Sequence, residues 1–253
     1  TQQGILGAVL ADGETVLENC ACEPEIQWLC RYMRSMGAKI QGDGTSEIRI
    51  QGVKSLSAGC IQVPPDRIVS GTYICAAAVT RSQIVLENPP EGELKAFLEV
   101  YRKMGGQYKG NSGKLLVNGK NVQSPVKLLE TGVYPGFPTD LQSPVMAVLS
   151  TIEGESCIRE MVFEDRYKAA DQLQKMGARI RVQGNEAVIC GVKTLHGAAV
   201  QAQELRGGAA LILAALGAKG VTALEGYSFV QRGYEHICQD LNALGAAVKR
   251  IQE

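Results

Sequence analysis

The residue that first suggests chemistry is Asp140, which lies in the stretch from Pro135 to Gln142. The two prolines of this stretch keep the backbone extended and delay a helix until Thr139, after which residues 141–150 are apolar enough to form one. A carboxylate at a helix start can accept backbone N–H bonds at the positive end of the helix dipole. Asp140 is therefore either the N-cap of this helix or a catalytic base.

A second candidate is the segment from Glu204 to Gly208, which places Arg206 and two glycines at the expected start of another helix. Free N–H groups, the helix dipole and a guanidinium all favour an anion at such a place. Glutamate is a poor N-cap, so we expect Glu204 to have another role. The glycine pair alone could equally be a device for close packing.

The elements that position these residues come from an internal repeat of about 70 residues. We expect each copy to contain a buried apolar helix, a strand, an amphipathic helix that stops at a glycine, and two or three further strands. The stopping glycines are Gly37, Gly105, Gly177 and Gly245. The buried helices are expected at 4–11, 71–79, 144–150 and 209–216, and the strands after them at 15–18, 83–87, 156–160 and 222–225. The fold class is therefore α/β, with buried helices and mixed sheets.

Pro64-Pro65 marks a hinge between two domains. One repeat copy cannot cover both faces of its own helix layer, so residues 1–64 are expected to be the last unit of a first domain that is otherwise missing. Residues 65–253 are expected to form a second domain of three units, the last of which ends at Glu253 before its closing strands. Because the chain begins at Thr1 rather than methionine, we expect a missing upstream segment.

The repeat also makes outliers visible. Arg166 stands where the other copies carry Ile26, Leu94 and Tyr234, so this position has lost its packing role. A buried arginine without a partner is costly. Arg166 therefore either points into a cleft or pairs with Glu164 at the surface.

The arginines share comparable positions in the copies. Arg166 and Arg232 occupy the same kind of strand-to-helix loop, so they and Arg206 could gather at one rim of the sheets, and Arg67, beside Asp66, could join them from the neighbouring unit. Several arginines around an acid indicate a small substrate that carries phosphate or carboxylate groups.

The composition argues against a nucleic-acid-binding protein, a membrane protein and a zinc protein. The 26 basic and 26 acidic residues cancel and form no basic run, which argues against nucleic acid or a membrane surface as the main partner. No apolar stretch could span a bilayer and no signal peptide is recognisable, so the sequence predicts a soluble, cytoplasmic protein. The eight cysteines are scattered singly and there are only two histidines, which argues against a zinc site and indicates that most cysteines are reduced core thiols.

Five ordered motifs together resemble the UDP-N-acetylglucosamine enolpyruvyl transferases over essentially the whole chain. They are Glu23-Pro24-Glu25-Ile26, Pro65-Asp66-Arg67-Ile68, the stretch Pro135 to Gln142, Val162-Phe163-Glu164-Asp165-Arg166, and Arg232-Gly233-Tyr234-Glu235. The resemblance implies an inside-out α/β barrel in which two domains, each of three repeated units, enclose the substrates. It also implies the family reaction, in which the enolpyruvyl group of phosphoenolpyruvate moves to the 3′-hydroxyl of UDP-N-acetylglucosamine and phosphate is released, the first committed step of peptidoglycan synthesis.

The resemblance further assigns roles to single residues. Asp140 takes the hydroxyl proton and, with the backbone at Val162, holds the nucleotide sugar. Arg206 and Arg232 bind phosphoenolpyruvate, and Glu204 and Arg232 join Asp140 as catalytic residues. The substrate-binding set also includes Glu164 and Arg166, with Glu23 and Arg67 lining the facing domain. No metal or organic cofactor is implied.

Two departures from the family pattern are visible. Members usually carry aspartate where this chain has Glu204, and a displacement of about 1 Å at a reacting group can slow a reaction on the order of 10²-fold. The family's lysine-asparagine pair, its loop with the cysteine proton donor and its uridine-binding residues have no counterpart here. The chain alone is therefore expected to be inactive.

Two alternatives remain open. A shikimate-pathway enolpyruvyl transferase shares the fold, although the motifs from Phe137 to Gln142 and from Arg232 to Glu235 favour the nucleotide sugar. A non-catalytic binding protein on the same scaffold would account for Glu204 and for the missing cysteine loop.

Overall fold

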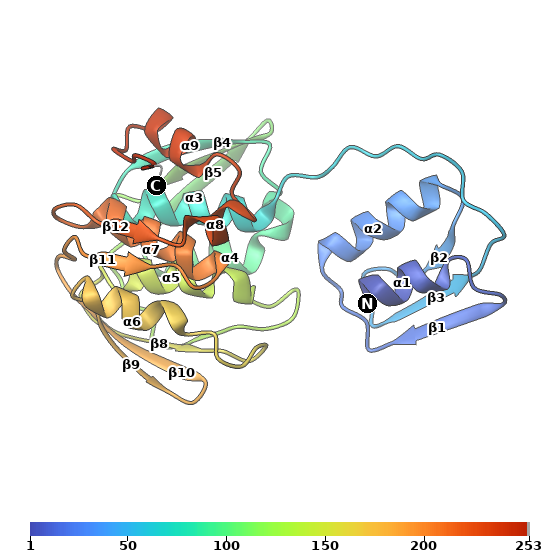
Figure 1. Ribbon diagram of the computed structural model, residues 1–253, viewed down its shortest axis with the longest axis horizontal. Coiled ribbons are helices and arrows are strands. Elements are labelled where there is room, and N and C mark those ends of the chain that lie inside the picture. The colour runs from blue at the N-terminus through green and yellow to red at the C-terminus, as the bar shows by residue number, and fades with distance from the viewer. Residues whose placement is uncertain (252–253) are drawn as a thin grey trace. The chain divides into compact units, whose positions relative to one another are not determined.

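The computed structural model describes residues 1–251 (Figure 1). The chain divides into two compact units. Unit 1 comprises Thr1–Pro65 and Val133–Gly136, and unit 2 comprises Asp66–Gly132 and the chain from Phe137 onward. The expected end of the last repeat copy at Glu253 lies outside the described residues.

Unit 1 holds one copy of the repeat. Its elements are α1 (Gln2–Ala8), β1 (Glu14–Glu18), α2 (Pro24–Ser35), β2 (Lys39–Gln41) and β3 (Glu47–Gln51), and the strands form an antiparallel sheet in the order β1-β3-β2. Proline is tolerated in the first turn of α2 because a backbone N–H at that position would have no partner within the helix. The helix packs Ile26 and Cys30 into the core. The apolar helix α1 buries Ile5 but leaves Leu6 exposed, and Leu10, which follows the helix, is exposed as well.

Unit 2 contains three further copies. The second copy consists of α3 (Arg67–Val79), β4 (Gln83–Glu87), the short 3-10 helix η1 (Glu91–Glu93), α4 (Lys95–Lys103), β5 (Gln107–Asn111) and β6 (Lys114–Asn118). The third consists of β7 (Leu129–Glu130), the 3-10 helix η2 (Thr139–Leu141), α5 (Gln142–Leu149), β8 (Gly154–Arg159), α6 (Lys168–Lys175), β9 (Arg179–Gln183) and β10 (Glu186–Gly191). The fourth consists of β11 (Ala199–Gln201), α7 (Leu205–Gly217), β12 (Ala223–Glu225), α8 (Tyr227–Gln231) and α9 (Ile237–Ala243).

The sheets of unit 2 combine hairpins with parallel pairs. Their strand orders are β4-β6-β5, β7-β8-β10-β9 and β11-β12. The pairs β7–β8 and β11–β12 are parallel, so α5 and α7 are the crossover helices of two β-α-β connections. Parallel strands end at the same edge of a sheet, and the loops that follow them therefore lie together.

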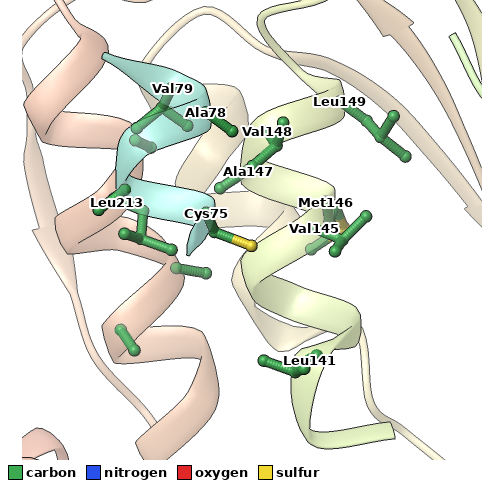
Figure 2. Packing of buried hydrophobic residues seen from close by; sticks show 14 of the residues in the cluster. Cys75, Ala78, Val79, Leu141, Val145, Met146, Ala147, Val148, Leu149 and Leu213 are labelled. Atoms are coloured by element: carbon green, nitrogen blue, oxygen red, sulfur yellow. The ribbon is translucent and has the colours of Figure 1, made fainter. Parts of the chain in front are cut away.

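The core of unit 2 is built around the three apolar helices α3, α5 and α7, which lie side by side with the sheets around them (Figure 1). Every residue of α5 is buried, and in α7 the run from Gly207 to Ala214 is buried. Figure 2 shows Cys75 of α3 directed towards α5. Burying one Val, Leu or Met side chain contributes about 1.5–3 kcal/mol, so this helix layer is the main source of stability.

The expected repeat of elements is confirmed. All four apolar helices and the strands after them are present, with bounds that differ by a few residues from those expected. The four stopping glycines have φ between 92° and 99°, a conformation that costs glycine little and other residues more. Among the described residues all eight cysteines are free thiols, but only Cys20, Cys30 and Cys75 are buried. No helix within residues 1–251 is long and apolar enough to cross a bilayer.

Candidate functional site

The centre of the candidate site is the carboxylate of Asp140, which two arginines hold. Arg206 donates from Nε and Nη2 to Oδ2 at 3.2 and 3.0 Å. Arg166 donates from Nη2 to Oδ1. The side chains of Arg206, Arg166 and Asp140 are 13%, 21% and 36% exposed, so both ion pairs are partly shielded from water and the carboxylate is the most accessible of the three groups.

Asp140 is not a helix cap. It lies in the 3-10 helix η2, ahead of α5, and neither helix has a side-chain cap. Of the two roles that the sequence left open, the N-cap is therefore wrong. The extra 3-10 turn removes the carboxylate from the N–H groups of α5 and leaves it to the arginines.

Topology explains why these residues meet. Asp140 follows β7 and Arg166 follows β8, its parallel neighbour, so both loops leave the same edge of one sheet. Arg206 follows β11 in the same way, at the start of α7, and α7 packs against α5. The expectation that residues from separate copies gather at one rim is met by Asp140, Arg166 and Arg206.

Arg206 is fixed from several directions. The carboxylate of Glu204 accepts hydrogen bonds from the N–H groups of Arg206, at 2.7 Å, and of Gly207. Glu204 is therefore the N-cap of α7, although glutamate is in general a poor N-cap. Extended backbone at Glu204 lets the longer side chain reach back to these groups. Arg206 Nη1 also donates to the hydroxyl of Tyr234 at 3.3 Å, and that hydroxyl is 2.8 Å from Thr72 Oγ1 on α3.

Charge and burial act together on these groups. Burial alone would lower the pKa of Arg206, but Tyr234 and Asp140 beside the guanidinium raise it above its ordinary value. Burial raises the pKa of Tyr234, against the opposing effects of Arg206 and Thr72. Arg206 therefore stays a cation, and Tyr234 stays a neutral hydrogen-bonding hydroxyl at any ordinary pH.

Arg166 is held by Asp140 and by an aromatic ring. Its guanidinium carbon lies 5.3 Å from the centre of the Phe163 ring, within the range of a cation–π contact. Its Nε is buried and has no partner among the described residues. Glu164 is exposed and forms no ion pair with Arg166 in the described chain, so the surface pairing that the sequence left open is wrong.

Sequence reasoning missed Glu160, which follows β8 directly and is 3% exposed. Its carboxylate accepts four hydrogen bonds, from the hydroxyls of Thr131 and Thr139 and from the N–H groups of Val162 and Phe163. The signal in the sequence was an acid at the end of an apolar strand, where a buried position is expected. Among the described residues, no group of three or more His, Cys, Asp or Glu side chains is arranged to hold a metal ion.

Comparison with known proteins decides the family. The family model of EPSP synthase (3-phosphoshikimate 1-carboxyvinyltransferase) matches residues 1–241. The chain belongs to the EPSP synthase family. UDP-N-acetylglucosamine 1-carboxyvinyltransferase 2 of Caldanaerobacter subterraneus is 43% identical over 251 residues, which are 99% of this chain and 60% of that protein. UDP-N-acetylglucosamine 1-carboxyvinyltransferase of Orientia tsutsugamushi is 44% identical over 255 residues, which cover 100% of this chain and 60% of that protein.

Solved structures show the family fold. The enolpyruvyl transferase NikO of Streptomyces tendae superposes with a TM-score of 0.84 at 27% identity, over 96% of this chain and 58% of that one. An EPSP synthase of Acinetobacter baumannii superposes with a TM-score of 0.72 at 20% identity, over 97% and 60% of the two chains. The expected enolpyruvyl transferase fold is therefore confirmed. The chain spans about 60% of the length of these EPSP synthase family members.

The remaining residues that the family resemblance singled out lie in different surroundings. Arg232 is exposed at the end of α8, and its side chain forms no hydrogen bond or ion pair within residues 1–251. The next residue, Gly233, lies close to the Arg206 guanidinium. Arg67 is buried as the first residue of α3. The N–H group of Val162 donates a hydrogen bond to the carboxylate of Glu160. Glu23 belongs to unit 1, whereas Asp140 belongs to unit 2.

Proposed function

We propose that the whole protein transfers the enolpyruvyl group of phosphoenolpyruvate to the 3′-hydroxyl of UDP-N-acetylglucosamine. Support comes from relatives above 40% identity whose names state 1-carboxyvinyl transfer to UDP-N-acetylglucosamine. The observation that carries the proposal is the carboxylate of Asp140 between two guanidiniums, because this reaction needs a base next to a site for anions. The reaction would be the first committed step of peptidoglycan synthesis, in the cytoplasm.

Asp140 is the proposed base. Its carboxylate is about one third exposed, so a substrate hydroxyl can reach it. As the 3′-oxygen bonds to C2 of phosphoenolpyruvate, the hydroxyl proton passes to Asp140 and C3 gains a proton from an acid. The tetrahedral ketal then loses phosphate from C2 and a proton from C3, which restores the double bond. By the family resemblance the acid is a cysteine on a loop that none of the eight cysteines here matches.

The arginines are the proposed anion site. Arg206 and the exposed Arg232 would hold the phosphate and carboxylate of phosphoenolpyruvate, and Arg166 would adjust the charge around Asp140. Glu204 contributes by capping the helix that presents Arg206. Val162, Glu164, Arg67 and Glu23 remain proposed contacts of the nucleotide sugar or of the facing domain.

The domain arrangement is also a proposal. Unit 1 would be one repeat unit of a first domain, and further units would cover the exposed apolar side chains of Leu6 in α1 and of Leu10 just after it. Unit 2 would be the second domain, and it would supply the carboxylate of Asp140 and the guanidinium groups of Arg166 and Arg206 to the site.

Phosphate release tests the proposal. The complete gene product, mixed with UDP-N-acetylglucosamine and phosphoenolpyruvate, is expected to release phosphate. Residues 1–253 alone are expected not to release phosphate, and phosphate release by this chain would contradict that expectation. Shikimate 3-phosphate is the discriminating substrate: release with it, and not with the nucleotide sugar, would favour the shikimate-pathway alternative. No release with either acceptor would favour a non-catalytic binding protein.

A further inference from the structure

Glu160 is a buried acid that the proposed chemistry does not use. Its carboxylate is 3% exposed and forms no ion pair within the described chain. Four hydrogen bonds stabilise it instead: Oε1 accepts from Thr131 Oγ1 at 2.8 Å, from Val162 N at 2.9 Å and from Phe163 N at 3.1 Å, and Oε2 accepts from Thr139 Oγ1 at 2.9 Å. A buried carboxylate is costly even when it is hydrogen-bonded, so its presence indicates a specific task.

The main chain of Glu160 does not need this side chain. Its N–H group donates to the carbonyl of Asn185 at 2.8 Å, and its own carbonyl accepts from Asn185 Nδ2 at 3.0 Å. These bonds already fix the end of β8. The carboxylate therefore acts on other segments.

Each oxygen of the carboxylate holds one of the two segments that build the site. Oε2 binds Thr139, which directly precedes Asp140 in η2. Oε1 binds the loop that leads to Arg166, and the Phe163 ring of that loop lies against the Arg166 guanidinium. One side chain thus connects the support of the base with the support of its arginine partner.

We infer that Glu160 is a positioning residue, which sets the distance between the Asp140 turn and the Arg166 loop and so keeps Asp140 aligned for proton transfer. The effect on turnover rests on the proposed function. The ion pairs cannot supply this alignment by themselves, because Asp140 is partly exposed and long arginine side chains follow a carboxylate that moves. A misplacement of about 1 Å at the reacting group is enough to slow the reaction on the order of 10²-fold.

Two threonines make a matched test. Thr139→Val and Thr131→Val each remove one hydroxyl from the Glu160 carboxylate without changing the shape of the side chain. Thr131 also accepts from Met161 N at 2.9 Å, so Thr131→Val should destabilise the fold at least as much as Thr139→Val. Only Thr139 is next to Asp140. A purely structural role therefore predicts equal effects or a larger one at Thr131, and a positioning role predicts the reverse.

The first readout is the NMR resonance of the Arg206 Nε–H group in residues 1–253, because that group donates to Asp140. We expect Thr139→Val to move this resonance towards that of free arginine and Thr131→Val to leave it near its original position. Glu160→Ala should also move it. Glu160→Gln, whose amide can still bind both segments, should restore it in part. An unmoved resonance in Thr139→Val, or equal shifts in both threonine variants, would overturn the inference.

The second readout is turnover by the complete gene product. We expect Thr139→Val to lower kcat on the order of 10²-fold with a smaller change in KM for phosphoenolpyruvate, and Thr131→Val to stay close to the original protein. The two readouts separate the two claims. If the resonance shifts as expected but no version of the protein releases phosphate, the proposed function fails and the positioning role stands. If phosphate is released and Thr139→Val leaves kcat unchanged, the positioning role fails.

Discussion

The most informative single change is Asp140→Asn, which removes one negative charge from between two guanidiniums and nearly keeps the side-chain shape. The carboxylate accepts two hydrogen bonds from Arg206 and one from Arg166. An asparagine keeps one acceptor oxygen, but its NH₂ group must face a guanidinium donor. One of the two arginines therefore loses its partner.

The size of the effect follows from burial. A hydrogen bond between charged groups contributes about 1.5–3 kcal/mol, and partial exposure reduces this through solvent screening. The Arg206 side is the less exposed of the two, and the Arg166 side is more accessible to water. We therefore expect Asp140→Asn to lower the free energy of unfolding of unit 2 by about 2 kcal/mol.

The assay is urea unfolding followed by circular dichroism, with Asp165→Asn as the matched control. Asp165 undergoes the same chemical change, but its side chain is 80% exposed and its partner, Lys168 Nζ, lies 3.2 Å away at the surface. The control should change the unfolding free energy by less than about 0.5 kcal/mol. Equal effects of the two changes would refute the argument, because they would show that water screens the Asp140 pairs completely.

The same variant separates binding from chemistry. In the complete gene product, loss of a general base should lower kcat about 10²- to 10⁴-fold. Affinity for phosphoenolpyruvate should be retained or increase, because a carboxylate no longer competes with the substrate for Arg206. Unchanged kcat would refute the role of Asp140 as the base.

Three further changes test other parts of the structure. Glu204→Ala removes the cap of α7 and should lower the unfolding free energy by about 1 kcal/mol in the same urea assay, whereas no change would contradict the capping role. Arg34 lowers the pKa of Asp43 through hydrogen bonds of 2.6 and 3.0 Å. This ion pair therefore stabilises unit 1 fully at pH values above the pKa of aspartate in the unfolded chain, and the contribution is lost as the pH falls through the lowered pKa of the folded state. Arg34→Gln should therefore lower the free energy of unfolding of unit 1 by about 0.5–1 kcal/mol at neutral pH and leave it unchanged in strong acid. Unfolding can be monitored by the fluorescence of the single tryptophan, which lies in α2, and an equal loss of stability at both pH values would contradict the linkage. Cys190 is exposed and should react with a maleimide at neutral pH, whereas burial raises the pKa of Cys75 and should keep it unmodified until the protein unfolds; early labelling of Cys75 would show that the helix layer opens.

The repeat could be predicted from the sequence because each copy contains the same local pattern of an apolar helix, a strand and an amphipathic helix that ends at a glycine. The apolar run that becomes α5 and the glycines that end the amphipathic helices are local signals, and local signals are read directly. The meeting of Asp140 with Arg206 could be anticipated only because the two residues occupy comparable places in successive copies. Sequence periodicity thus supplied a long-range contact that composition alone does not give.

Other features depend on side chains whose partners lie in another segment. Glu160 contacts residues from two loops, and its neighbours Thr131 and Thr139 carry no pattern that points to it. The pairing of Arg166 with Asp140 rather than Glu164 depends on the path of the loop after β8. Such choices are decided by tertiary geometry, which spacing along the chain does not encode.

The three apolar helices α3, α5 and α7 of unit 2 each follow an acidic residue, but only one of these acids serves the candidate site directly. Asp66 caps α3 with bonds of 2.6 and 3.0 Å to two N–H groups, and Glu204 caps α7 in the same manner. In the copy between them, the 3-10 helix η2 separates Asp140 from the first turn of α5, so its carboxylate caps neither helix and accepts hydrogen bonds from the two arginines instead. Thr139, bound to the buried Glu160, holds that extra turn in place. The lost cap costs α5 about 1 kcal/mol, and the fully buried helix can tolerate this because its stability comes from packing.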